Sequence, residues 1–238
     1  MLRSLVSISM AGMLALSAGS AMGEKVILRQ GFEKFDEHSL GTAGPEFDKD
    51  GGAWFDFGKK EGSPKVTVKE FYTTNKATTG KSVAIIRGTE TGTTDFWLMG
   101  RWAPDIDKGK IRIAFSTLRD TDQSGFSIFL GNKEKLIGEN TIALGVSNVT
   151  SYGEKLTVMD QKGAWEPVPL LVLVGTWTRI VIDVDFTART YTVSVNGASL
   201  GRAIPFESKT PICQIAFIPI HPPGNLSYID DVEIISLD

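Results

Sequence analysis

The stretch Gly175–Gly197, GTWTRIVIDVDFTARTYTVSVNG, decides the fold class of this chain. Alternating positions in both halves of the stretch are apolar: Ile180, Ile182, Val184, Tyr191, Val193 and Val195. Polar side chains stand between them: Arg179, Asp183, Thr192, Ser194 and Asn196. This period of two predicts an antiparallel pair of strands that covers a core with one face only.

Short runs of β-branched and aromatic residues recur along the chain, separated by clusters of Gly, Asn, Asp and Pro. One of them, 110–116, alternates in the same way, with one face made of Ile111, Ile113 and Phe115 and the other of Arg112, Ala114 and Ser116. We expect strands at 66–71, 81–86, 95–102, 110–115, 125–130, 141–146, 170–174, 177–184, 191–195, 212–218 and 228–235. Because no run has helical periodicity over a helical length, the pattern predicts one all-β domain, a sandwich or a barrel.

The first 23 residues have the pattern of a targeting segment. Arg3 precedes the uncharged apolar run Ser4–Leu16, and mostly small residues follow in Ser17–Gly23. This order is typical of a secretory signal peptide, and the apolar run is shorter than the about 20 residues that a membrane span needs. We therefore expect a signal peptide over 1–23 and a single domain over 24–238, with no transmembrane segment in the mature protein. The mature protein would be secreted, extracellular or periplasmic.

Composition and charge exclude several other classes of protein. Of 238 residues, 42% are hydrophobic, and 25 Lys and Arg stand against 28 Asp and Glu. A disordered chain and a multi-span membrane protein do not have this composition, and the lack of a basic surplus argues against a nucleic-acid partner. The single cysteine, Cys213, cannot form an internal disulfide, and we expect it to be buried within an apolar stretch. Two histidines are too few for a His-rich metal centre.

Three stretches carry a family resemblance. Gly31–Gly41 (GFEKFDEHSLG) looks like the opening strand of bacterial secreted jelly-roll modules, and Gly175–Gly197 resembles a hairpin of laminin-G-like and concanavalin A-like domains. Tyr228–Ile234 (YIDDVEI) is similar to the closing strand of the same group. The resemblance implies a jelly-roll β-sandwich of two curved antiparallel sheets, with ligands on the concave face or in rim loops. It does not fix the activity, because lectins, glycanases, lyases and adhesion modules share this fold.

Catalytic motifs of enzymes on this fold are not found in the sequence. Laminarinase-like relatives carry two glutamates around an aspartate on one strand, because retaining hydrolysis needs two carboxylates at short range. The nearest approach is Asp183 and Asp185, which we interpret as a solvated strand face followed by a turn. The arginine, histidine and tyrosine strands of alginate-lyase-like relatives are absent as well.

Carboxylates near the two ends of the domain are candidates for a structural metal site. Glu33 on the first strand would approach Asp230 or Asp231 on the last strand if the terminal strands pair. Two carboxylates brought together repel each other unless a cation or a proton separates them, and modules that resemble this chain often hold a structural Ca²⁺ there. The alternative is that one carboxylate faces solvent and the other caps a turn.

Sugar recognition needs flat apolar rings together with fixed polar groups. Trp54 and Trp165 lie in turn-rich, polar surroundings and are expected to be exposed, whereas Trp177 begins a strand and is expected to be buried. Trp97 and Arg101 share one face of their strand, although Trp97 fits a core position equally well. The candidate ligand-binding residues are Trp54, Trp97, Arg101 and Trp165.

Taken together, these features favour a secreted, lectin-like module that binds a poly- or oligosaccharide without cleaving it. Two alternatives stay open on the same fold. One is a polysaccharide-degrading enzyme, a glycoside hydrolase or polysaccharide lyase, with its carboxylates scattered over several strands. The other is a cell-surface module that recognises protein.

Overall fold

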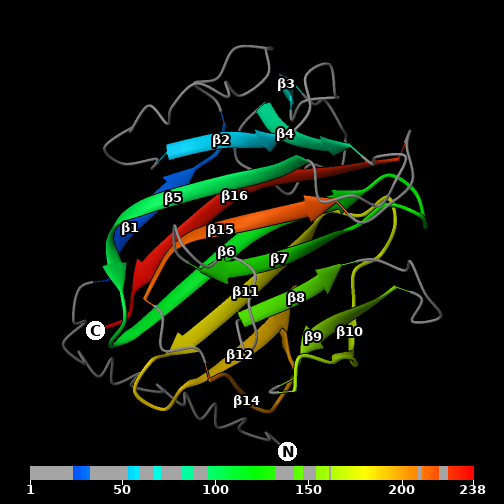
Figure 1. The fold of residues 1–238 in the computed structure, drawn as a ribbon. Coiled ribbons are helices and arrows are strands. Elements are labelled where there is room, and N and C mark those ends of the chain that lie inside the picture. The colour runs from blue at the N-terminus through cyan, green and yellow to red at the C-terminus, as the bar shows by residue number, and fades with distance from the viewer. Residues whose placement is uncertain are drawn as a thin grey trace, which may run out of the picture.

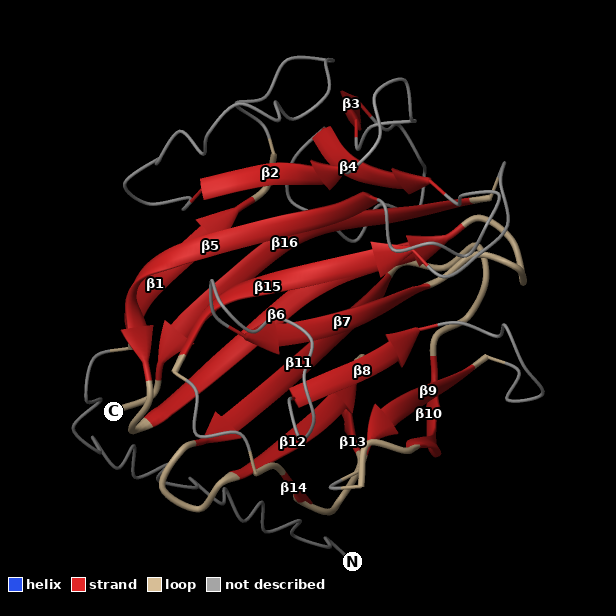
Figure 2. Ribbon diagram, in the orientation of Figure 1, coloured by secondary structure: helices blue, strands red, loops and turns tan. Residues whose placement is uncertain are grey.

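The computed structural model of the chain describes residues 24–32, 53–58, 67–70, 82–87, 96–131, 142–146, 154–160, 162–207, 211–219 and 225–238. Every regular element in these ranges is a β-strand, and the strands are arranged in two layers (Figures 1 and 2). Among the described residues there is accordingly no helix that is long and apolar enough to cross a membrane.

One layer is a nine-stranded antiparallel sheet within the described part of the chain. Its main path runs in the order β13 (Ala198–Ser199), β12 (Thr190–Val195), β11 (Thr178–Asp185), β6 (Lys110–Arg119), β16 (Leu226–Ser236), β4 (Ser82–Arg87) and β3 (Thr67–Glu70). Two further strands join it at the side: β1 (Lys25–Gln30) pairs with β16, and β14 (Ile204–Pro205) pairs with β12. The first and last described strands are therefore neighbours, which is the condition for the expected approach of Glu33 to Asp230 or Asp231.

The other layer is a seven-stranded antiparallel sheet. Its order is β10 (Trp165–Leu171), β9 (Lys155–Met159), β8 (Ile142–Val146), β7 (Phe126–Gly131), β15 (Ile212–Pro219), β5 (Phe96–Ile106) and β2 (Ala53–Gly58). The main hydrophobic core draws its residues from both sheets, and Phe115 of β6 meets Phe217 of β15 edge to face across it. The all-β, two-sheet jelly-roll prediction is confirmed.

The hairpin that decides the fold has the predicted faces. In β11 and β12 the alternating apolar side chains are buried and the residues between them are half-buried. The strands pair with Ile180 opposite Val195 and Val184 opposite Tyr191. After β12, Asn196 and Gly197 both have positive φ (49° and 82°), which is the backbone of the tight two-residue turns that match strand twist.

The interior contains two polar side chains that connect separate segments. The hydroxyl of Tyr191 crosses the core to the carbonyl oxygens of Ala143 and Met159, at 3.4 and 3.3 Å, and burial raises the pKa of this tyrosine well above its ordinary value. Arg119 is 1% exposed and donates to three backbone carbonyls: Asp122, Ser124 and Val172. Burial lowers the pKa of Arg119. Both side chains thereby bind backbone carbonyls of other segments of the chain.

The edge strand β10 carries two prolines. Pro167 and Pro169 are exposed, and Val168 and Leu170 between and after them are buried. Proline has no N–H for a ladder, so within a sheet it is favoured on edge strands, at strand ends and at bulges. The edge position of β10 explains why a proline-containing stretch that reads as a loop folds as a strand.

Candidate functional site

A second apolar cluster lies on the face of the seven-stranded sheet that points away from the main core. It comprises Met99, Phe129, Ala143, Ala216 and Ile218, with Met159 and Trp165 packed against it. Strand register places Ala216 opposite both Met99 and Phe129, Phe129 opposite Ala143, and Trp165 opposite Met159. We call this side of the sheet the outer face. The five cluster residues are themselves buried, and they form a row across the strands that ends at the partly exposed Trp165.

Trp165 is the aromatic end of this row. It opens the edge strand β10 and is half-buried, so part of its surface remains in contact with solvent. Its indole meets the ring of Phe129 edge to face, with centroids 6.2 Å apart and an interplanar angle of 82°. This arrangement holds the indole in place while leaving part of it accessible, as a stacking surface for a ligand requires.

Arg101 and Gln214 supply polar groups on the same outer face. They lie two residues from Met99 and Ala216 on the same strands, and positions two apart in a strand share a face. The Nε and Nη2 atoms of Arg101 donate to Oε1 of Gln214 at 3.4 and 3.2 Å. The predicted residues Arg101 and Trp165 thus share one face of one sheet, with the apolar row between them.

Trp54 is a correction to the prediction. Its side chain is 5% exposed and belongs to the main core, so the expectation of an exposed loop tryptophan is wrong. The residue lies in β2 and pairs with Gly100 of β5, and its ring occupies the space above that glycine. Phe32 packs edge to face against it at 5.1 Å between ring centroids. A missing side chain on the neighbouring strand makes the room for this indole.

The other predicted ligand and metal residues have mixed outcomes. Trp97 lies in β5 opposite Phe57, and its side chain is outside the described part of the structure. Trp177 is buried at 5% exposure, as expected, although it packs in a satellite cluster with Leu118 and Tyr228 and not in the main core. Glu33 lies outside the described residues; the first strand, β1, ends at Gln30, before it.

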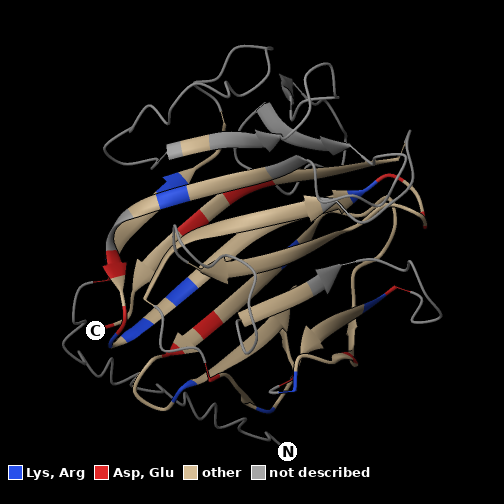
Figure 3. Ribbon diagram, viewed as in Figure 1, with Lys and Arg blue, Asp and Glu red and all other residues tan. Residues whose placement is uncertain are grey.

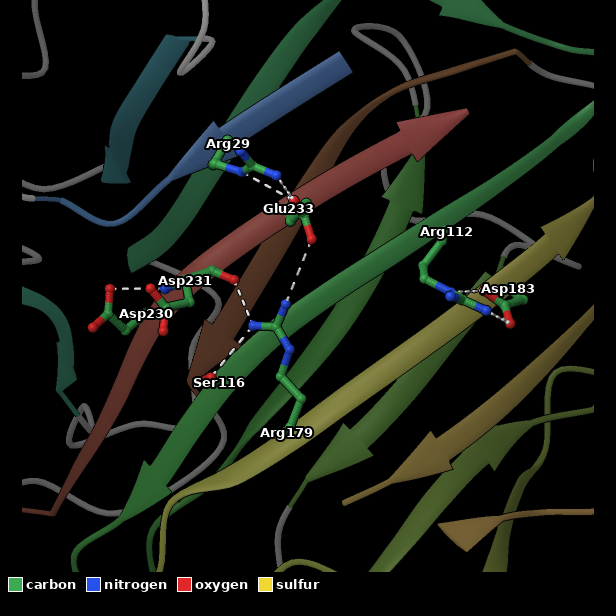
Figure 4. A network of polar contacts seen from close by, with 8 residues as sticks. All are labelled: Arg29, Arg112, Ser116, Arg179, Asp183, Asp230, Asp231 and Glu233. Carbon is green, nitrogen blue, oxygen red and sulfur yellow. Dashed lines mark hydrogen bonds and ion pairs between the residues drawn. The ribbon is translucent and has the colours of Figure 1, made fainter. Parts of the chain in front are cut away.

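Charged residues recur along the strands of the nine-stranded sheet (Figure 3), and a polar face of this sheet is built around Arg179 (Figure 4). The guanidinium of Arg179 donates to Ser116 Oγ at 3.3 Å and to the carbonyl oxygen of Asp231 at 2.7 Å, and lies 4.0 Å from a carboxylate oxygen of Glu233. Arg29 binds the other oxygen of Glu233. Burial lowers the pKa of Arg179, and the three nearby carboxylates oppose that effect.

Asp230 and Asp231 lie at an irregularity in the last strand. The pairing of β16 with β6 shifts register between Asp230 and Glu233, and Asp231 adopts a positive φ of 47°. Asp230 is fully buried and accepts a hydrogen bond from the backbone N–H of Asp231 at 2.7 Å. The guanidinium of Arg179 places positive charge beside Asp230 and Asp231. Within the described ranges no group of three or more His, Cys, Asp or Glu side chains is arranged to hold a metal ion.

Asp183 and Asp185, the nearest approach to a catalytic pair, are both engaged in ion pairs. Arg112 binds the carboxylate of Asp183 with two hydrogen bonds, at 2.7 and 2.9 Å, which raise the pKa of the arginine. Asp185 accepts a hydrogen bond from the N–H of Ala188, as expected for the start of a turn, and pairs with Lys110 at 3.2 Å. These contacts lower the pKa of Asp185, the Ala188 hydrogen bond most strongly. The pKa of Asp185 is thus shifted in the direction opposite to the one that a general acid needs.

Sequence reasoning missed Phe129 and Gln214 as members of the outer face. Phe129 lies in the run 126–130, where nearly every residue is apolar, so alternation does not separate inner from outer positions. Gln214 follows Cys213 in a similar apolar run, and it is the one polar side chain between Ile212 and Ile218. That interruption was the available signal, because a polar side chain within an apolar strand marks its outward face.

Comparisons with known proteins show a shared fold at low sequence identity. No protein-family model and no curated protein matches the sequence. The catalytic domain of a family 131 glycoside hydrolase from Coprinopsis cinerea superposes with a TM-score of 0.54 and 15% identity, covering 88% of this chain and 94% of that one. Domain 4 of AbnA, an extracellular arabinanase from Geobacillus stearothermophilus, was solved in complex with arabinotriose. It superposes with a TM-score of 0.52 and 13% identity, covering 90% of this chain and 93% of that one.

A sialidase superposes with a TM-score of 0.51 and 11% identity over 78% of this chain, which spans only 17% of the sialidase. At such identities the similarity concerns the fold alone. The two antiparallel sheets and these superpositions agree with the resemblance read from the sequence. The chain has the concanavalin A-like jelly-roll fold.

Proposed function

We propose that this chain is a secreted, non-catalytic carbohydrate-binding module whose ligand, an oligo- or polysaccharide, binds on the outer face. The observation that carries the proposal is the part-exposed indole of Trp165, held by the buried apolar row, with the part-exposed Arg101 on the same face and bound to the buried Gln214. An indole stacks on the apolar face of a pyranose or furanose ring, and a guanidinium–amide pair donates hydrogen bonds to hydroxyls.

Two further findings support this proposal. The arabinanase domain that superposes on nearly the whole chain is named in complex with a sugar, arabinotriose. On the nine-stranded sheet, the carboxylates of Asp183 and Glu233 are bound by arginines, an arrangement that suits a structural role better than acid–base chemistry. Secretion, in this proposal, follows from the signal-peptide pattern of residues 1–23.

The first experiment separates binding from catalysis. The purified chain is applied to a glycan array, and each glycan that binds is then incubated with it in a reducing-sugar release assay. We expect binding without release of reducing ends. Release above the level of a heat-inactivated sample would favour the enzyme alternative, and an array without any binding would favour a module that recognises protein.

The second experiment locates the site. Trp165→Ala should weaken a glycan found on the array by about tenfold or more, which corresponds to roughly 1.4 kcal/mol. Leu171→Ala is the matched control, because Leu171 is an exposed apolar side chain on the same edge strand and is 50% exposed. If the Trp165 variant bound the glycan as tightly as the wild type, the outer face would not be the binding site.

A further inference from the structure

A cleft of about 520 Å³ lies at one end of the sandwich, and neither Trp165 nor Arg179 lines it. It is formed by the start of β1, the turn between β5 and β6, and the last residues after β16. In Figure 1 these segments converge beside the C-terminus. The volume lies within the range of about 300–1,000 Å³ that is usual for small-molecule sites.

The walls of the cleft are aliphatic. Val26, Ile27, Ile106 and Ile111 line it, and Val26 is 44% exposed, one of the few large apolar side chains at the surface of the described residues. A register shift between Val26 and Leu28 makes Ile27 an extra residue in β1 relative to β16. Such bulges redirect side chains locally, and here two consecutive apolar residues line the same cleft.

The rim of the cleft is charged, with carboxylates in excess. Asp105, near the end of β5, and Asp107, just after it, are both exposed and both line the cleft. In the described part of the chain neither carboxylate has a hydrogen bond or ion pair. Asp238 also lines the cleft, with one oxygen bound by the N–H of Lys110 at 2.8 Å. Two lysines, Lys25 and Lys108, complete the rim, so three carboxylates stand against two ammonium groups.

We propose that this cleft binds a small aliphatic molecule with a cationic amine at one end. The aliphatic part contacts Val26, Ile27 and Ile106, and the ammonium group lies between the carboxylates of Asp105 and Asp107. Aliphatic side chains lack the flat rings that sugars stack on, so the chemistry of this site differs from that of the outer face. The cleft proposal therefore does not depend on the proposed function.

The test uses n-hexylammonium, n-hexanoate and n-hexanol as probes, with binding to the full chain measured by ligand-observed NMR at low salt. We expect n-hexylammonium to bind at least tenfold more tightly than n-hexanoate, with n-hexanol between them. Across methyl-, butyl- and hexylammonium the affinity should rise about three- to fourfold for each buried CH₂ group. Equal affinity for the cation and the anion, or no dependence on chain length, would overturn the proposal.

Variants locate the site. The double variant Asp105→Asn, Asp107→Asn should weaken n-hexylammonium at least fivefold and leave n-hexanol unchanged. Asp122→Asn is the matched control: Asp122 is also an exposed aspartate next to a strand of the nine-stranded sheet, but lies in the turn after β6, outside the cleft. Unchanged melting temperatures would verify that both proteins are folded. If Asp122→Asn weakened n-hexylammonium equally, the binding would be explained by general surface charge and the proposed site would be refuted.

Discussion

Replacing Gly100 by Ala places a methyl group where the indole of Trp54 already lies. A Cβ atom built on Gly100 would come within 2.6, 2.7 and 2.9 Å of three ring carbons of Trp54. Carbon atoms normally approach no closer than about 3.5 Å, so the ring or the strand has to move. The ring has little freedom, because Phe32 packs against it edge to face and both side chains are buried in the core.

The size of the effect follows from two opposing contributions. Overpacking a core by one methyl group destabilises a protein by about 1–3 kcal/mol. Removing a glycine restricts the unfolded chain and returns about 0.4–1 kcal/mol, since the backbone of Gly100 does not have the positive φ that would exclude alanine. We therefore expect Gly100→Ala to lower the free energy of unfolding by about 1–2 kcal/mol, which is roughly 2–8 °C in Tm for a domain of this size.

A double-mutant cycle, measured by urea unfolding with circular dichroism, checks the cause. Trp54→Leu removes the ring atoms that clash, so Gly100→Ala in that background should be neutral or slightly stabilising. The coupling free energy between the two positions should then be about 1–3 kcal/mol. A Gly100→Ala protein as stable as the wild type would refute the packing of Trp54 over the glycine. A destabilisation of the same size in both backgrounds would assign the effect to the strand and not to the ring.

Three further predictions concern other parts of the chain. Trp177→Ala should lower the free energy of unfolding by about 3–5 kcal/mol in urea titrations, because it empties a buried site, and a loss below about 1 kcal/mol would contradict that burial. Asp185 has a folded-state pKa below its unfolded value, so its contribution to stability exists above the unfolded pKa and is lost as the pH falls through the folded one. Asp185→Ala should therefore reduce stability at pH 7, and the difference from the wild type should shrink as the solution is acidified through the folded-state pKa. If Glu33 and Asp230 share a Ca²⁺ ion, EDTA should lower the Tm and added CaCl₂ restore it, whereas a melting curve indifferent to both would remove the calcium proposal.

Local alternation predicted the parts of the fold in which one face of a strand is polar. In 178–185 and 190–195 the period of two assigns each side chain to a face, and burial follows it residue by residue. Alternation predicts burial less well in β6. Ala114 and Ser116 lie on the face that was predicted to be polar, yet both are only 3% exposed. The guanidinium of Arg179 reaches across from the neighbouring strand to Ser116 and helps to cover this face.

Trp54 and Trp165 show where local sequence information ends. The loop-like Gly and Asp residues before Trp54 suggested exposure, but the space for its ring is provided by Gly100, on a strand that the local sequence does not identify as a neighbour. Trp165 precedes two prolines, which normally argue against a strand, and only the edge position of β10 makes them compatible with one. In both cases the deciding fact is which strand lies alongside, and this is a property of the assembled sheet.

The prolines of β10 also bear on how copies of this protein behave toward one another. An uncovered strand can act as a template on which a second molecule adds its own strand, and this is a common first step toward fibrils. A strand arriving beside β10 would meet carbonyl groups at Pro167 and Pro169 but no N–H donors, so its hydrogen-bond ladder would be interrupted twice within three residues. Growth of aggregates from this side is thereby disfavoured even at high local concentration. The two prolines thus disfavour pairing of another copy of the chain along the strand that carries Trp165.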